Sequence, residues 1–114
     1  VGREIELEIL VEVRDERELA LALSLGAQLI GVNNRDLETL VIDASTADRV
    51  LPLIPRSCCA VAESGFEDRA DIERAASNGA DAILVGSLLS RSADPEATVH
   101  SLTTVTRIPH ARQN

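Results

Sequence analysis

Three polar residues at the ends of short aliphatic segments could act together on a small substrate. Glu12, Asn33 and Glu63 each lie at or next to the end of a run rich in Val, Leu, Ile or Ala. A carboxyl group at the mouth of an apolar site loses water, which raises its pKa and lets it act as an acid or a base. Each residue alone is better explained as a solvated strand end. The catalytic interpretation therefore depends on the three converging.

Two glycine–serine pairs could bind a phosphate. Ser64-Gly65 and Gly86-Ser87 follow the third and fourth aliphatic segments. Glycine lets backbone N–H groups approach an anion, and a helix N-terminus adds a favourable dipole. A short helical turn is expected at residues 87–90. Either pair alone also fits an ordinary turn, but the two in this order, with the extra turn, favour a phosphate site.

A polar loop and two histidines complete the candidates. In the segment Asn33–Leu37, Arg35 and Asp36 are expected to support the loop through hydrogen bonds. His100 and His110 have no partners at the spacing of metal ligands, so no metal site is predicted.

Alternating strand and helix signals must position these residues. Strands are predicted at residues 9–13, 29–32, 58–62 and 82–85. Helices are predicted at residues 16–25, 43–53, 68–78 and from about 94 onward, in addition to the short turn. Asp15 can cap the first helix, while Gly26 and Gly79 end the first and third. This alternation predicts a parallel sheet with right-handed crossovers.

Four strand–helix units fit either a small open sheet or half of a barrel. Neighbouring side chains of a strand point to opposite faces, so each strand has one apolar face and one that ends in a polar residue or Gly. Those last residues all fall at the C-terminal strand ends, where barrel enzymes hold their active sites: Glu12, Asn33, Glu63 and Gly86. The predicted fold class is α/β, half of a TIM (β/α)8 barrel with four parallel βα units. The half-barrel domain covers residues 1–106, and residues 107–114 form a frayed tail.

The composition of the chain limits the classes of partner that it could bind. The 114 residues carry 19 acidic and 11 basic side chains, for a net charge of −8, which disfavours nucleic acid and anionic membranes. No apolar run is long enough to span a membrane, and no secretory signal is visible. Cys58 and Cys59 are adjacent and point to opposite faces, as expected for packed thiols in a reducing cytoplasm. Every basic residue is Arg, and there is no Lys.

At these residues the sequence resembles the indole-3-glycerol-phosphate synthase family. The resemblance runs from Glu6 to about Leu102, and its order and spacing fit the last four strands of that family, five to eight. It is carried by the segments Leu10–Val13, Leu29–Leu37, Ala62–Gly65 and Ile83–Leu89.

The resemblance implies a lyase reaction in tryptophan biosynthesis. Family members close an indole ring from a carboxyphenylamino-deoxyribulose phosphate, releasing carbon dioxide and water, without a metal or organic cofactor. By resemblance, Glu12 acts as a base or stabilises the cationic intermediate, while Asn33 and Glu63 hold the substrate's hydroxyl and anthranilate portions. The resemblance also assigns loop support to Arg35 and Asp36, and phosphate binding to Ser64, Gly65, Gly86 and Ser87.

The missing lysine limits this activity. The general-acid lysine of the family, and the Glu and Lys of its first strand, belong to the N-terminal half of the barrel. Arg is a poor replacement because it keeps its proton near neutral pH. Losing a catalytic acid removes a factor of about 100 to 10,000 in rate. The chain alone is therefore expected to be inactive.

Three interpretations remain open. The first is a synthase half that regains activity with a separate N-terminal half. The second is a non-catalytic, self-assembling phosphate-binding half-barrel. The third, an isomerase of the same pathway, is disfavoured by the loop at residues 33–37. Two open sheet edges and an exposed inner face predict a homo-oligomer, a dimer or higher. That face is expected to expose Leu10, Leu29, Val61 and Leu84.

Overall fold

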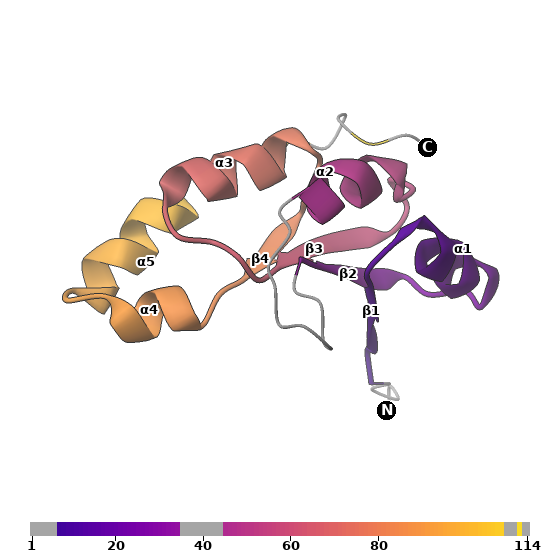
Figure 1. The fold of residues 1–114 in the computed structure, drawn as a ribbon, viewed down its shortest axis with the longest axis horizontal. Helices are drawn as coiled ribbons and strands as arrows, with labels where there is room; N and C mark the ends of the chain where they lie inside the picture. The colour runs from indigo at the N-terminus through magenta and orange to yellow at the C-terminus, as the bar shows by residue number, and fades with distance from the viewer. Residues whose placement is uncertain (1–6, 35–44, 109–111, 113–114) are drawn as a thin grey trace, which may run out of the picture.

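The chain alternates strands and helices around one sheet (Figure 1). The computed structural model describes residues 7–34, 45–108 and 112. Its strands are β1 (Leu10–Val13), β2 (Leu29–Asn33), β3 (Cys59–Glu63) and β4 (Ala82–Leu84). Its helices are α1 (Glu16–Ser24), α2 (Ser45–Val50), α3 (Arg69–Ser77), α4 (Ser87–Arg91) and α5 (Pro95–Thr103), with a 3-10 helix, η1 (Leu51–Leu53), after α2.

The four strands form a single parallel sheet in the order β1-β2-β3-β4. Helices α1, α2 and α3 follow one another along one face of it, and α4 and α5 lie beyond the β4 edge (Figure 1). The predicted fold class is confirmed: four parallel βα units in one sheet, as in half of a TIM barrel.

Aspartate caps fix where the longer helices begin. Asp15, Asp68 and Asp94 each accept the backbone N–H of the residue three positions on, at 2.8, 3.1 and 3.1 Å. Such a cap satisfies one of the free donors of a first helical turn. The helix predicted at residues 43–53 is α-helical only to Val50 within its described part. It then tightens into η1, because Pro52 has no N–H for an α-helical bond.

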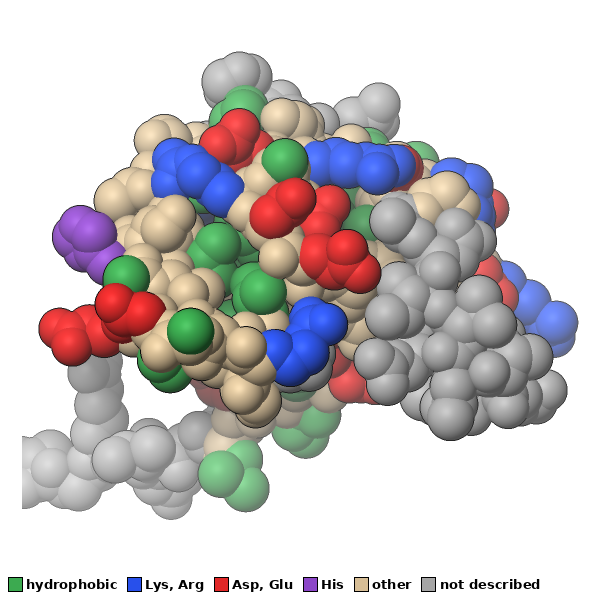
Figure 2. Space-filling view, turned by 60° about the vertical axis from the view of Figure 1, so that its left-hand side comes forward, with side chains coloured by type: hydrophobic (Ala, Val, Ile, Leu, Met, Phe, Trp, Pro, Cys, Tyr) green, Lys and Arg blue, Asp and Glu red, His purple; other side chains and the backbone are tan. Residues whose placement is uncertain are grey.

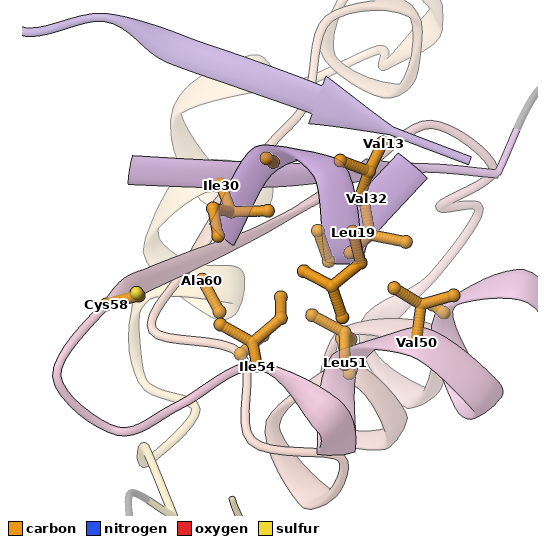
Figure 3. Close-up of a cluster of buried hydrophobic side chains, with 14 of the residues drawn as sticks. Val13, Leu19, Ile30, Val32, Val50, Leu51, Ile54, Cys58 and Ala60 are labelled. Carbon is orange, nitrogen blue, oxygen red and sulfur yellow. The ribbon is translucent and has the colours of Figure 1, made fainter. Parts of the chain in front are cut away.

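The main core lies between the sheet and helices α1 and α2. Side chains from β1, β2 and β3 point toward those of the helices and of the segment after η1 (Figure 3). All of the following are at most 3% exposed: Val13, Leu19, Ile30, Val32, Val50, Leu51, Ile54 and Ala60. Burying branched aliphatic side chains of this kind contributes about 1.5 to 3 kcal/mol each.

The opposite, inner face of the sheet is exposed at its two edge strands. Leu10 on β1 and Leu84 on β4 are 38% and 54% exposed, as predicted for that face. Leu29 is half-buried. The prediction for Val61 was wrong, since it is 9% exposed. Val61 lies in an inner strand, paired on both sides with β2 and β4, and its neighbours cover it.

Arg112, from the tail predicted to be frayed, is buried and 4% exposed. Its guanidinium donates to the backbone carbonyls of Ile54, Pro55, Cys58 and Gly79. Residues 109–111 and 113–114 lie outside the described residues, and the boundary near residue 106 stays a prediction. Across residues 7–34, 45–108 and 112, no helix is long and apolar enough to cross a membrane.

Candidate functional site

The sheet register brings the three predicted polar residues to one end of the inner face. Asn33 at the end of β2 lies directly opposite Glu63 at the end of β3. Glu12 on β1 lies opposite Gly31, two positions before Asn33 on the same face of β2. The three side chains therefore gather at the C-terminal ends of three neighbouring strands.

The carboxyl group of Glu63 reaches back across β2 toward β1. Glu63 is 3% exposed, and Val61, two positions before it on the same face, is 9% exposed. Its Oε2 atom lies over Gly31, in the space where a side chain at that position would begin. Among the described residues, no group hydrogen-bonds to this buried oxygen. A buried polar atom without a partner calls for a ligand, a water or a proton.

Burial and Glu12 together raise the pKa of Glu63 to about 7. The largest cause is the loss of water around the carboxyl group. A hydrogen bond with Glu12 and its negative charge add to the effect. A neighbouring negative charge makes ionisation of a carboxyl group harder. With a pKa of about 7, Glu63 can donate or accept a proton in the range where enzymes work.

Asn34 fixes the ends of β2 and β3 against helix α2. Its side chain is 5% exposed; Nδ2 donates to the carbonyl of Ser64 at 3.2 Å, and Oδ1 accepts the N–H of Ala47 at 3.0 Å. Its backbone N–H donates to the carbonyl of Glu63 at 3.2 Å. Sequence reasoning missed this role. The available signal was its place next to Asn33, which turns it to the helix side, where a buried amide must be hydrogen-bonded.

The residues predicted to bind phosphate lie on two loops that leave neighbouring strands. Glu63 pairs with Leu84, so the loops at 64–65 and 85–86 start side by side. Ser64 and Gly65 both have left-handed backbone angles, with φ of 67° and 81°. Such a conformation costs a non-glycine residue about 1 to 3 kcal/mol and is concentrated at functional sites.

The second loop, at residues 85–86, leaves open space beside Gly86. Gly86 directly precedes α4, and no described atom lies within 4 Å of where its Cβ would stand. An anion could approach the backbone there. The backbone of Ser87 opens α4, but its side chain lies outside what the structure describes. Arg35 and Asp36, predicted to support the loop after β2, also lie outside the described residues.

The comparison with known proteins decides the family. The family model described as "Indole-3-glycerol phosphate synthase" matches residues 1–102. The chain belongs to the indole-3-glycerol phosphate synthase family. This confirms the resemblance stated on the sequence.

Curated indole-3-glycerol phosphate synthases support the assignment. One from Dehalococcoides mccartyi is 44% identical over 102 residues, which cover 90% of this chain and 39% of the relative. One from Listeria monocytogenes is 47% identical over 98 residues, with shares of 86% and 38%. One from Nocardioides sp. is 47% identical over 104 residues, with shares of 91% and 40%. The chain thus spans about two fifths of the length of these synthases.

All of the predicted site residues lie inside the stretch that matches the synthase family, and Arg112 lies beyond it. Within the described part of the chain, no group of three or more His, Cys, Asp or Glu side chains could hold a metal ion. His100 is exposed on α5, and His110 is not among the described residues.

Proposed function

We propose that these residues form strands five to eight, the C-terminal half, of the barrel of an indole-3-glycerol phosphate synthase in tryptophan biosynthesis. The reaction closes an indole ring from a carboxyphenylamino-deoxyribulose phosphate, with loss of carbon dioxide and water. The observation that carries the proposal is the register of Asn33 with Glu63, with the Glu63 carboxyl group turned toward Glu12. It gathers proton-transfer and polar groups at the end of the strands where barrel enzymes react.

Each polar residue has a proposed role. Glu12 is exposed on the inner face and acts as a base or stabilises the cationic intermediate of ring closure. Glu63 and Asn33 hold the anthranilate and hydroxyl portions of the substrate. With its raised pKa, Glu63 can donate a hydrogen bond when it carries its proton and accept one when it does not.

The phosphate of the substrate binds across the two adjacent loops. Ser64 and Gly65 turn the chain after β3, and Gly86 leaves the N-terminus of α4 open to an anion. Gly86 and Ser87 complete the site through their backbone N–H groups, and Arg35 with Asp36 supports the loop after β2. No cofactor is needed. An exposed, unbridged Cys59 is in keeping with a reducing compartment such as the cytoplasm.

The 114 residues alone are proposed to be inactive. They contain no Lys, so they offer no ammonium group as a general acid. A separate N-terminal half would supply that acid and close the open edges of β1 and β4.

A second candidate function is a non-catalytic, self-assembling phosphate-binding half-barrel. The exposed Leu10 and Leu84 on the two edge strands favour it, because such side chains are covered when strands of another chain pair there.

Binding by NMR separates the two candidates. The labelled chain is titrated with inorganic phosphate and with indole-3-glycerol phosphate. A synthase half binds the indole compound more tightly than phosphate, and Asn33→Ala weakens the first but not the second. A phosphate module binds both equally, with no effect of Asn33→Ala. Absence of any shift at Gly65 and Gly86 with either compound contradicts both candidates.

A further inference from the structure

The backbone conformation at Gly31 does not require glycine. It sits inside β2, paired on one side with Glu12 and on the other with Val61. Its backbone is not among the left-handed glycines, which are Gly26, Gly65 and Gly79. Glycine inside a strand weakens it and often marks a close approach of other atoms. The reason for this glycine must therefore lie in what packs against it.

The atoms that pack against Gly31 belong to the catalytic candidate itself. A Cβ at position 31 would lie 1.9 Å from Oε2 of Glu63 and 3.0 Å from its Cδ. The next atom is Cδ1 of Leu10, at 3.2 Å. All three atoms are at the ends of flexible side chains, so a methyl group at position 31 would move the Glu63 carboxyl group and leave the strand in place.

Gly86, in the exposed loop between β4 and α4, is a glycine of the same site that has open space beside it. No described atom lies within 4 Å of where its Cβ would stand. The two closest contacts at Gly31 are both with the Glu63 carboxyl group, and Leu10 on β1 lies beside it.

We infer that Gly31 is a positioning residue: its missing side chain forms the seat that holds the Glu63 carboxyl group against Glu12. The inference rests on the proposed function and deepens it, since Glu12 and Glu63 are two of the residues to which that function assigns roles. Any larger residue at position 31 pushes the carboxyl group into solvent and separates the pair.

The groups around Glu63 predict how its pKa changes when the carboxyl group is displaced. Glu12 on β1 is the described titratable group whose charge acts on Glu63. The neighbours from β2 and β4, Asn33 and Leu84, carry no charge. Displacement into water removes both the burial and the repulsion by Glu12. The pKa of Glu63 should then fall.

The test is Gly31→Ala in the full chain, with the side-chain carboxyl carbon of Glu63 followed by NMR as pH is varied. The Glu63→Gln variant assigns the signal. In Gly31→Ala the pKa of Glu63 should fall from about 7 toward the ordinary value of 4.5. In the control, Gly86→Ala, it should stay near 7. An unchanged pKa of Glu63 in a folded Gly31→Ala chain overturns the inference.

A double variant keeps the test decisive if Gly31→Ala folds poorly. The clash predicts that adding Glu63→Ala restores the unfolding midpoint to that of Glu63→Ala alone. If the loss in midpoint from Gly31→Ala is the same with and without Glu63, the seat does not exist and the inference is wrong. Neither readout needs turnover, so the positioning role can fail while the proposed synthase function stands, or the reverse.

Discussion

The guanidinium of Arg112 lies 2.6 Å from the carboxylate of Asp81, just before β4. The same carboxylate accepts the backbone N–H of Ala60 at 2.9 Å, so Arg112 and β3 meet at one residue. Arg112 also crowds Gly79, where a Cβ would lie 2.2 Å from its Cγ. The end of the chain is thereby attached to the N-terminal edge of β3 and β4.

Arg112→Ala is expected to destabilise the chain strongly. It leaves the Asp81 carboxylate and several carbonyls without their buried partner, and breaking a buried ion pair costs about 3 to 5 kcal/mol. Urea unfolding measures the loss. Arg107→Ala is the matched control, because Arg107 contacts the same Asp81 at 3.4 Å but is 60% exposed. That control should change stability by no more than about 1 kcal/mol. Equal losses in both variants would contradict the structure.

Stability is expected to fall as pH rises from 4.5 to about 7. In that range the folded chain keeps the proton of Glu63, whereas the unfolded chain, with its ordinary pKa, has released it. Folding therefore becomes less favourable up to the folded pKa and is level above it, by a total on the order of 3 kcal/mol. Glu12 is the described charged group that faces Glu63 in the folded chain.

Glu63→Gln should remove this pH dependence. Urea unfolding of both chains at several pH values gives the difference, which should favour the variant increasingly from pH 4.5 to about 7 and stay level above that. Glu67→Gln, at an exposed position, is the control and should keep the slope of the original chain. An unchanged slope in Glu63→Gln would show that another group carries the effect.

Asn34→Ala should destabilise the packing of the strand ends of β2 and β3 against α2. The variant leaves the N–H of Ala47 and the carbonyl of Ser64 without their buried partner, which costs about 1 to 3 kcal/mol. Thermal unfolding measures the loss, and hydrogen exchange at Gly65 should become faster. Gln28→Ala, at an exposed position, should stay within about 0.5 kcal/mol. If Asn34→Ala matches that control, the cross-link does not hold the loops.

The purified chain is expected to form a dimer or higher oligomer through its open edges. Leu84→Lys should reduce the mass seen by light scattering, because it places a charge on the exposed inner face of β4. Leu53→Lys is the control, since Leu53 is equally exposed, at 51%, but lies in η1 away from the edge strands. A monomer at all concentrations would contradict the prediction.

The described charged groups around α3, α4 and α5 are of mixed sign. Figure 2 shows the face with α3, α4 and α5, where acidic and basic side chains are interspersed around hydrophobic ones. Several form pairs along or between helices, such as Arg69 with Glu73 at 2.8 Å and Arg74 with Asp48. Exposed pairs of this kind contribute about 0 to 1 kcal/mol.

Local signals in the sequence predicted the strands, the helices and the gathering of the site. Asp15 predicted a helix start because its cap involves residues three positions apart. Glu12, Asn33 and Glu63 were predicted to converge because period-two alternation and a parallel sheet determine which face and which end they occupy.

What the sequence did not reveal depends on contacts between distant segments. The tail has no periodicity, so nothing local predicts that Arg112 reaches carbonyls more than thirty positions away. Likewise, Gly31 reads as an ordinary strand glycine until the rotamer of Glu63 is known. Burial of Val61 follows from its place in the middle of the sheet rather than from its own type.

The most direct test of the account is an assay for indole-3-glycerol phosphate. The purified 114-residue chain is assayed alone and mixed with the N-terminal half of a curated relative. We predict no product from the chain alone, product from the mixture, and loss of that product when the chain carries Glu12→Gln. Turnover by the chain alone, or an assembled complex of both halves that makes no product, would contradict the account.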